Sequence, residues 1–280
     1  MVQHIIVPVD GSDASWRAAD TAIELAHRCD ASIEVVEVVF DQPDVAEAVA
    51  RLTARLSERD TAGLDVATRV ELAPESVAQT VAALVAEQPD ATVVMASHGR
   101  GRSAALLGSV TEELLQRIFG PILVVGPRAS APAFTGPIVA TVDGSDASES
   151  VLPLAAAWGI ELGVEPWIVE VADPDVVVSP DLNESAYPAR LARKLSQESG
   201  HAVQFDVLHG RHVHDEVASY AETLGASLIV ASTHGRTGMS RFVIGSTAAA
   251  FVRHAPCPVL LVRPPHLRDR RIGQVQRQEA

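Results

Sequence analysis

The chain has 280 residues, 47% of them hydrophobic and 21% charged, and its formal net charge is -14. That size fits two domains of about 100–150 residues each, and the negative charge argues against a surface built to bind nucleic acid. Lys194 is the only lysine, so the chain has no Gly-Lys-Ser/Thr phosphate loop. No apolar run approaches the ~20 residues that cross a bilayer, so we expect a cytoplasmic protein without a membrane partner.

The first half of the chain alternates between two kinds of segment. Short runs rich in Val and Ile predict buried parallel strands, and stretches with apolar residues at i, i+3, i+4 and i+7 predict helices. The expected strands are Ile5–Val9, Ile33–Val39, Val66–Val70, Thr92–Ala96 and Ile122–Val125. The expected helices are Ala18–His27, Val45–Arg59, Val77–Val85 and Val110–Ile118.

The second half repeats this order. Val9–Ser15 returns as Val142–Ser148, and Gly108-Ser109 returns as Gly245-Ser246, which indicates a duplicated unit. Strand–helix alternation with short links predicts two tandem doubly wound, Rossmann-like α/β domains, each a five-stranded parallel sheet with helices on both faces. The expected strands of the second unit are Ile138–Val142, Trp167–Val171, Val203–Leu208, Leu228–Ala231 and Val259–Val262.

Composition divides the chain into four parts. We expect domains at residues 1–127 and 137–264. Residues 128–136 form a linker rich in Pro, Ala, Ser and Gly, which favours a semi-extended segment. Residues 265–280 are polar and aperiodic, so we expect a disordered tail.

An acidic turn follows the first strand of each unit. Asp10 and Asp143 each precede Gly-Ser-Asp. In one interpretation these residues only make a turn and cap the next helix. In the other, the aspartate lies at the carboxyl end of a strand near the topological switch point, where α/β sheets bind ligands, and accepts hydrogen bonds from the ligand.

Glycine-rich loops follow the fourth strand of each unit. The first contains His98-Gly99-Arg100 and continues to Gly108-Ser109, and the second contains His234-Gly235-Arg236 and continues to Gly245-Ser246-Thr247. Glycines allow close backbone approach, and a helix that starts at Gly-Ser directs amides and its positive dipole end toward an anion. Two copies favour a phosphate site over a simple turn with solvated arginines.

Together, the Val-Asp-Gly-Ser, His-Gly-Arg and Gly-Ser motifs, with Pro-Ile-Leu-Val and Pro-Val-Leu-Leu at the last strands, resemble the universal stress proteins in their tandem two-domain form. The likeness covers roughly residues 2–126 and 137–263. It implies binding of ATP (or AMP or ADP), with Mg2+ held through the phosphates, by a loop written G-x2-G-x9-G-(S/T). The residues that it places around the nucleotides are Pro8, Val9, Asp10, Val38, Ala96, His98, Gly99, Arg100, Gly108 and Ser109 in the first unit and Thr141, Val142, Asp143, Val171, Ser232, His234, Gly235, Arg236, Gly245, Ser246 and Thr247 in the second.

The loops depart from that pattern in two ways. Ala96 and Ser232 stand where the first glycine is expected, and a side chain there crowds the approaching ribose-phosphate. Eight residues separate Gly99 from Gly108, whereas nine separate Gly235 from Gly245. We therefore expect the second site to bind nucleotide better than the first.

The resemblance predicts a nucleotide-dependent stress or signalling regulator with slow ATP hydrolysis at most and no assigned catalytic residue. Its expected partners are an adenine nucleotide, an unidentified protein and, as an option, a second copy of the chain. Two alternatives stay open: a nucleotide-free interaction module of the same fold, and an enzyme of the adenine-nucleotide α-hydrolase type.

Histidines gather in one loop of the second unit. His209, His212 and His214 could ligate a metal ion. A polar loop at a helix start accounts for them more simply, so we predict no metal here and retain the three histidines as secondary candidates.

Overall fold

The computed structural model describes residues 2–42, 44–73, 75–99, 107–130, 132–175, 184–234 and 244–264. Its first half contains β1 (His4–Val9), α1 (Asp13–Cys29), β2 (Ser32–Val39), α2 (Asp44–Ser57), β3 (Val66–Leu72), α3 (Val77–Glu87), β4 (Thr92–Ala96), α4 (Ser109–Arg117) and β5 (Ile122–Val125). Its second half contains β6 (Ile138–Val142), α5 (Asp146–Glu149), α6 (Leu152–Leu162), β7 (Pro166–Ala172), α7 (Ala186–Ser199), β8 (Gln204–His209), α8 (Val213–Leu224), β9 (Leu228–Ser232), α9 (Ser246–His254) and β10 (Val259–Val262).

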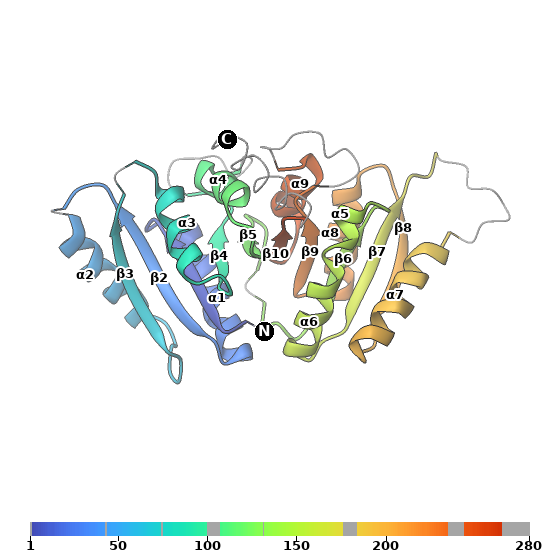
Figure 1. The fold of residues 1–280 in the computed structure, drawn as a ribbon, viewed down its shortest axis with the longest axis horizontal. Helices are drawn as coiled ribbons and strands as arrows, with labels where there is room; N and C mark the ends of the chain where they lie inside the picture. The colour runs from blue at the N-terminus through green and yellow to red at the C-terminus, as the bar shows by residue number, and fades with distance from the viewer. Residues whose placement is uncertain are drawn as a thin grey trace, which may run out of the picture.

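The ten strands form one sheet in the order β3-β2-β1-β4-β5-β10-β9-β6-β7-β8. Within each half all pairs are parallel, and β5 and β10 meet antiparallel in the middle, with Val124 opposite Val259. Figure 1 shows the two halves side by side around this junction. The predicted doubly wound fold is therefore confirmed in both halves, and the halves share a continuous sheet.

Helices cover both faces of this sheet. Successive side chains of a strand point to opposite faces, so each buried strand contributes to two layers of the core. Ile5 and Val7 of β1 belong to the core cluster on one face, which includes residues of α1, α2, α6 and α7. Ile6 of the same strand belongs to the cluster on the other face, which includes residues of α3, α4, α8 and α9. All three side chains are fully buried, as the continuous apolar runs of the sequence predict for parallel strands.

The junction between the halves is held by more than the central strand pair. The Val2 backbone N–H donates to the Glu161 carboxylate at 2.9 Å, and Arg28 Nη2 donates to the Leu162 carbonyl at 2.6 Å. Phe134, in the segment between the halves, is fully buried. The connecting segment is thus anchored in the core, although its described residues form no helix or strand.

Most element boundaries lie within two residues of the predicted ones. The largest difference is α1, which begins at Asp13 and not Ala18, because Ser12 Oγ accepts a hydrogen bond from the Ser15 N–H at 3.2 Å and caps the helix there. The expected tail, residues 265–280, lies outside the described residues. No helix among the described residues combines the length and the apolar character needed to cross a bilayer.

Candidate functional site

Each half has a cavity at its topological switch point. β1 lies between β2 and β4, and β6 lies between β7 and β9, so the helices that follow these strands leave the sheet on opposite faces and open a crevice at the carboxyl ends. The first cavity measures about 190 Å³ and the second about 230 Å³.

The acidic turn caps a helix and also lines the first cavity. Gly11 has φ +78°, a left-handed conformation that favours glycine. Asp10 Oδ1 accepts from the Ser12 N–H at 2.9 Å and from Ser12 Oγ at 2.5 Å, and Ser15 Oγ accepts from the Asp10 N–H at 3.3 Å. Both Asp10 and Ser15 are lining residues. The two interpretations of this motif are thus compatible, because the cap fixes the carboxylate beside the cavity.

The second half reproduces this turn. Asp143 Oδ1 accepts from the Ser145 N–H at 3.0 Å and from Ser145 Oγ at 2.5 Å, and Gly144 has φ +83°. Ser148 Oγ accepts from the Asp143 N–H at 3.1 Å. Asp143 and Ser148 line the second cavity. The same side chains therefore meet the same space in both copies.

Gly99 lies directly against the first acidic turn. A Cβ atom at this position would lie 2.3 Å from Asp10 Oδ2, so a side chain here would displace the Asp10 carboxylate from its present position. Both residues line the cavity. Its counterpart Gly235 lies outside the described residues, as do Arg100 and Arg236.

The helices α4 and α9 begin at glycine N-caps, Gly108 and Gly245. The Gly108 N–H donates to the Ser97 carbonyl at 2.7 Å, and the Gly245 N–H donates to the Thr233 carbonyl at 2.9 Å. A Cβ would lie 3.3 Å from that carbonyl oxygen at Gly108 and 3.1 Å from it at Gly245. These glycines therefore let each helix start close to the end of its strand.

The first three residues of each helix line a cavity. A glycine N-cap has no side chain that could accept hydrogen bonds from the first helical amides, so these donors are available to an anion. The positive end of the helix dipole adds to this preference. The lining residues are Ser109, Val110 and Thr111 in α4 and Ser246, Thr247 and Ala248 in α9.

A histidine follows the strand that leads into each loop. His98 Nδ1 lies 2.9 Å from Ser97 Oγ, and His234 Nδ1 lies 2.9 Å from Thr233 Oγ1. Both histidines line their cavities, as do Ala96 and Ser232 at the ends of β4 and β9. The residues that replace the first motif glycine thus border the cavities.

The cavities differ in their apolar walls. Val38 lines the first cavity with Pro8 and Val9. Val171, expected in the same role, does not line the second and packs against the core from β7. The second cavity is instead bounded by Thr141 and Val142 from β6 and by residues that the sequence analysis missed.

Most of the lining residues that the sequence analysis missed come from strands and from the first turns of helices, and Phe251 lies further along α9. Ser15 and Ser148 were detectable, because they recur at the same place in both motifs. The other missed residues are Val36, Val77, Met95, Val110 and Thr111 in the first half and Val213, Ala231, Thr233, Ala248 and Phe251 in the second. Most of them are apolar, and no sequence motif distinguishes an apolar residue beside a cavity from any other core residue.

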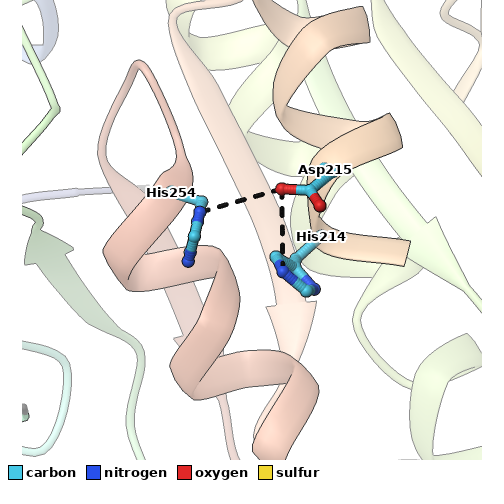
Figure 2. A group of neighbouring side chains, drawn as sticks. All are labelled: His214, Asp215 and His254. Carbon is cyan, nitrogen blue, oxygen red and sulfur yellow. Dashed lines mark ion pairs between the residues drawn. The ribbon is translucent and has the colours of Figure 1, made fainter. Parts of the chain in front are cut away.

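The three candidate metal-ligating histidines do not form one group. His209 Nε2 lies 3.0 Å from Glu184 Oε2, whereas the rings of His212 and His214 are neighbours, with centroids 6.1 Å apart. His214 also lies beside Asp215 and His254. Figure 2 shows that His254 reaches this group from α9. Burial and then the neighbouring His214 lower the pKa of His254. The sequence missed His254 because it is 40 residues away and becomes a neighbour only through the packing of α8 on α9.

The fold and the paired cavities define a tandem Rossmann-like α/β protein. Each half has one cavity at the switch point of its sheet, the usual place for a ligand in this class of fold. The model of the universal stress protein family matches the chain twice, at residues 1–126 and 135–263. The chain belongs to this family.

Curated relatives share both halves. A universal stress protein of Mycolicibacterium smegmatis is 32% identical over 217 residues, covering 73% of this chain and 71% of its own length. Universal stress protein Rv2005c of Mycobacterium tuberculosis H37Rv is 31% identical over 289 residues, covering 93% and 97%. The second alignment covers nearly all of both chains, so this relative shares the tandem arrangement, and the first alignment extends beyond one half.

Solved structures show the same fold. PA1789 of Pseudomonas aeruginosa PAO1 superposes with a TM-score of 0.69 at 20% identity, covering 95% of this chain and 94% of that one. A universal stress protein of Archaeoglobus fulgidus reaches 0.66 at 16% identity, covering 93% and 98%. These likenesses concern the fold of the whole tandem chain.

Proposed function

We propose that the chain is a nucleotide-dependent regulator that binds ATP, or AMP or ADP, in its two switch-point cavities. One observation carries the proposal. In both halves a turn carboxylate and the first three residues of a glycine-capped helix line the same cavity. A nucleotide needs both features, since its ribose hydroxyls donate hydrogen bonds and its phosphates accept them.

Each part of the nucleotide has a matching group. Asp10 and Asp143 would accept from the ribose hydroxyls, and the first amides of α4 and α9 would donate to phosphate oxygens. Val36, Val38 and Met95 offer the first cavity an apolar wall for the adenine ring. Mg2+ would accompany the phosphates and neutralise part of their charge.

The two sites have different strengths. The nine-residue spacing in the second half fits the family loop, which favours phosphate binding there. The first cavity has the fuller apolar wall, which favours the base. We retain the second site as the tighter one, because the phosphates carry the charge that the helix dipole and amides recognise.

The proposed role is regulatory. We assign no catalytic residue and expect slow hydrolysis at most. Nucleotide occupancy would change the surface that the chain offers to a partner protein or to a second copy of itself. We place this activity in the cytoplasm.

The first test identifies any ligand that the purified protein carries. The native chain is denatured and the released small molecules are analysed by mass spectrometry, and emptied protein is titrated with ATP by calorimetry. ATP, ADP or AMP in the released fraction, or saturable ATP binding, supports the proposal. An empty protein with no heat of binding would favour the nucleotide-free interaction module, and pyrophosphate release would favour the α-hydrolase enzyme.

Site-specific variants then assign the binding. Gly245→Ala places a methyl 3.1 Å from the Thr233 carbonyl oxygen, and Gly108→Ala places one 3.3 Å from that of Ser97, so each variant displaces one helix start. We expect at least about a tenfold loss at the altered site, or ~1.4 kcal/mol. Gly120→Ala is the matched control, because its methyl meets nothing closer than 3.8 Å. Unchanged affinity in both site variants would refute the assignment.

A further inference from the structure

A group of two imidazoles and one carboxylate lies outside the parts of the chain assigned to nucleotide binding. His214 and Asp215 belong to the first turn of α8, and His254 is the last residue of α9. One ligand atom from each lies within 4.8 Å of the other two. Figure 2 shows the three side chains directed toward one another from the two helices.

The separations within the group suit a shared ion better than mutual hydrogen bonds. His214 Nε2 lies 3.6 Å and His254 Nδ1 lies 3.8 Å from the same carboxylate oxygen, Asp215 Oδ1. Both distances are too long for hydrogen bonds. Ligands about 2.05 Å from a tetrahedral zinc ion lie about 3.3 Å apart, so small side-chain rotations would bring all three atoms into range.

The chain's own duplication shows that the common fold does not need these residues. Val77 and Val213 both begin a helix and both line a cavity, so His214 and Asp215 correspond to Ala78 and Gln79. The ninth residue of α4 is Arg117, where α9 has His254. All three polar residues therefore distinguish the second half, and they do so at positions that meet in space.

The ligand set selects the kind of metal. Ca2+ and Mg2+ prefer several oxygen ligands, and this group offers a single carboxylate. The positive charges of Arg128 and Arg253 also act on His254. They repel a cation, so an ion bound here needs strong ligand bonds in addition to electrostatic attraction. Imidazole nitrogen forms strong bonds with zinc and similar ions.

We infer that His214, Asp215 and His254 form a binding site for a divalent cation of the zinc class, with water in the fourth position. The ion would join the first turn of α8 to the last turn of α9. Val213, next to His214, and Phe251, one turn before His254, both line the second cavity. Metal binding would thus brace two walls of that cavity.

The test uses the full chain without a histidine tag, freed of metal by a chelator and titrated with Zn2+ by calorimetry. We expect one zinc ion per chain and at least about tenfold weaker binding in His214→Ala, His254→Ala and Asp215→Asn. His209→Ala is the matched control, because His209 pairs with Glu184 outside the group. Mg2+ and Ca2+ at the same concentration should neither bind nor compete.

Two further measurements keep the test decisive. The unfolding temperature of each variant in chelator should equal that of the parent, which separates lost ligands from lost folding. Co2+ bound to the parent should give the strong visible absorption of a four-coordinate site. Absence of stoichiometric zinc binding, binding that survives in His254→Ala, or an octahedral cobalt spectrum would overturn the assignment.

Discussion

The contact between Gly99 and Asp10 gives the sharpest test of the first site's geometry. In Gly99→Ala the new methyl would lie 2.3 Å from Asp10 Oδ2, more than 1 Å inside the ~3.5 Å separation of atoms in van der Waals contact. Asp10 Oδ1 accepts two hydrogen bonds from Ser12, at 2.9 and 2.5 Å. The carboxylate therefore has to give up this arrangement to make room.

The expected cost follows from those bonds. Each hydrogen bond to a charged group contributes about 1.5–3 kcal/mol, and partial exposure of Asp10 lets water replace part of the loss. We expect the free energy of unfolding to fall by about 1–3 kcal/mol, with a drop of about 2–4 °C in the unfolding temperature per kcal/mol. Nucleotide binding at the first site should weaken as well.

A double-mutant cycle isolates the cause. Urea and thermal unfolding are measured for Gly99→Ala, Asp10→Ala and the double variant, with Gly120→Ala as the neutral glycine control. In the Asp10→Ala background Gly99→Ala should cost less than about 0.5 kcal/mol, because the clashing carboxylate is gone. An equal loss in both backgrounds would refute the reasoning, since it would place the strain in the backbone and not at Asp10.

Two other predictions concern a buried ion pair and the thiols. Glu37 is 5% exposed and binds Arg51 Nη2 at 2.5 Å, so Arg51→Met should cost roughly 3 kcal/mol in urea unfolding by leaving a buried carboxylate unpaired. The exposed Arg117–Glu113 pair is the control, and Arg117→Met should cost under about 1 kcal/mol; equal losses would contradict the role of burial. Burial raises the pKa of Cys257 to about 12, and burial with the Glu161 charge raises that of Cys29 to about 12. Because a raised pKa leaves about one thiolate in 10⁴ at pH 8, the folded protein should resist iodoacetamide at that pH and react once unfolded. Rapid labelling of native Cys29 would disprove this.

Sequence patterns determined the fold and marked the turns and helix starts beside the cavities, and the family resemblance supplied most of the other candidate lining residues. Parallel strands buried on both faces need unbroken runs of Val and Ile, so segments such as Thr92–Ala96 were found with their true bounds. The duplicated Asp-Gly-Ser and Gly-Ser motifs marked Asp10, Gly108 and their counterparts, because turns and helix caps depend on residues adjacent in the chain. Local chemistry of this kind is readable without coordinates.

Tertiary structure decided the features that depend on distant residues. Val171 does not line the second cavity, whereas Phe251 does, because the packing of α9 sets that wall and no local pattern encodes it. His254 joins His214 and Asp215 for the same reason, since α8 and α9 meet only in the folded chain. The close approach of Gly99 to Asp10 likewise arises between two strand ends far apart in sequence. Periodicity reports which face of an element is buried, but only packing reports which side chains meet there.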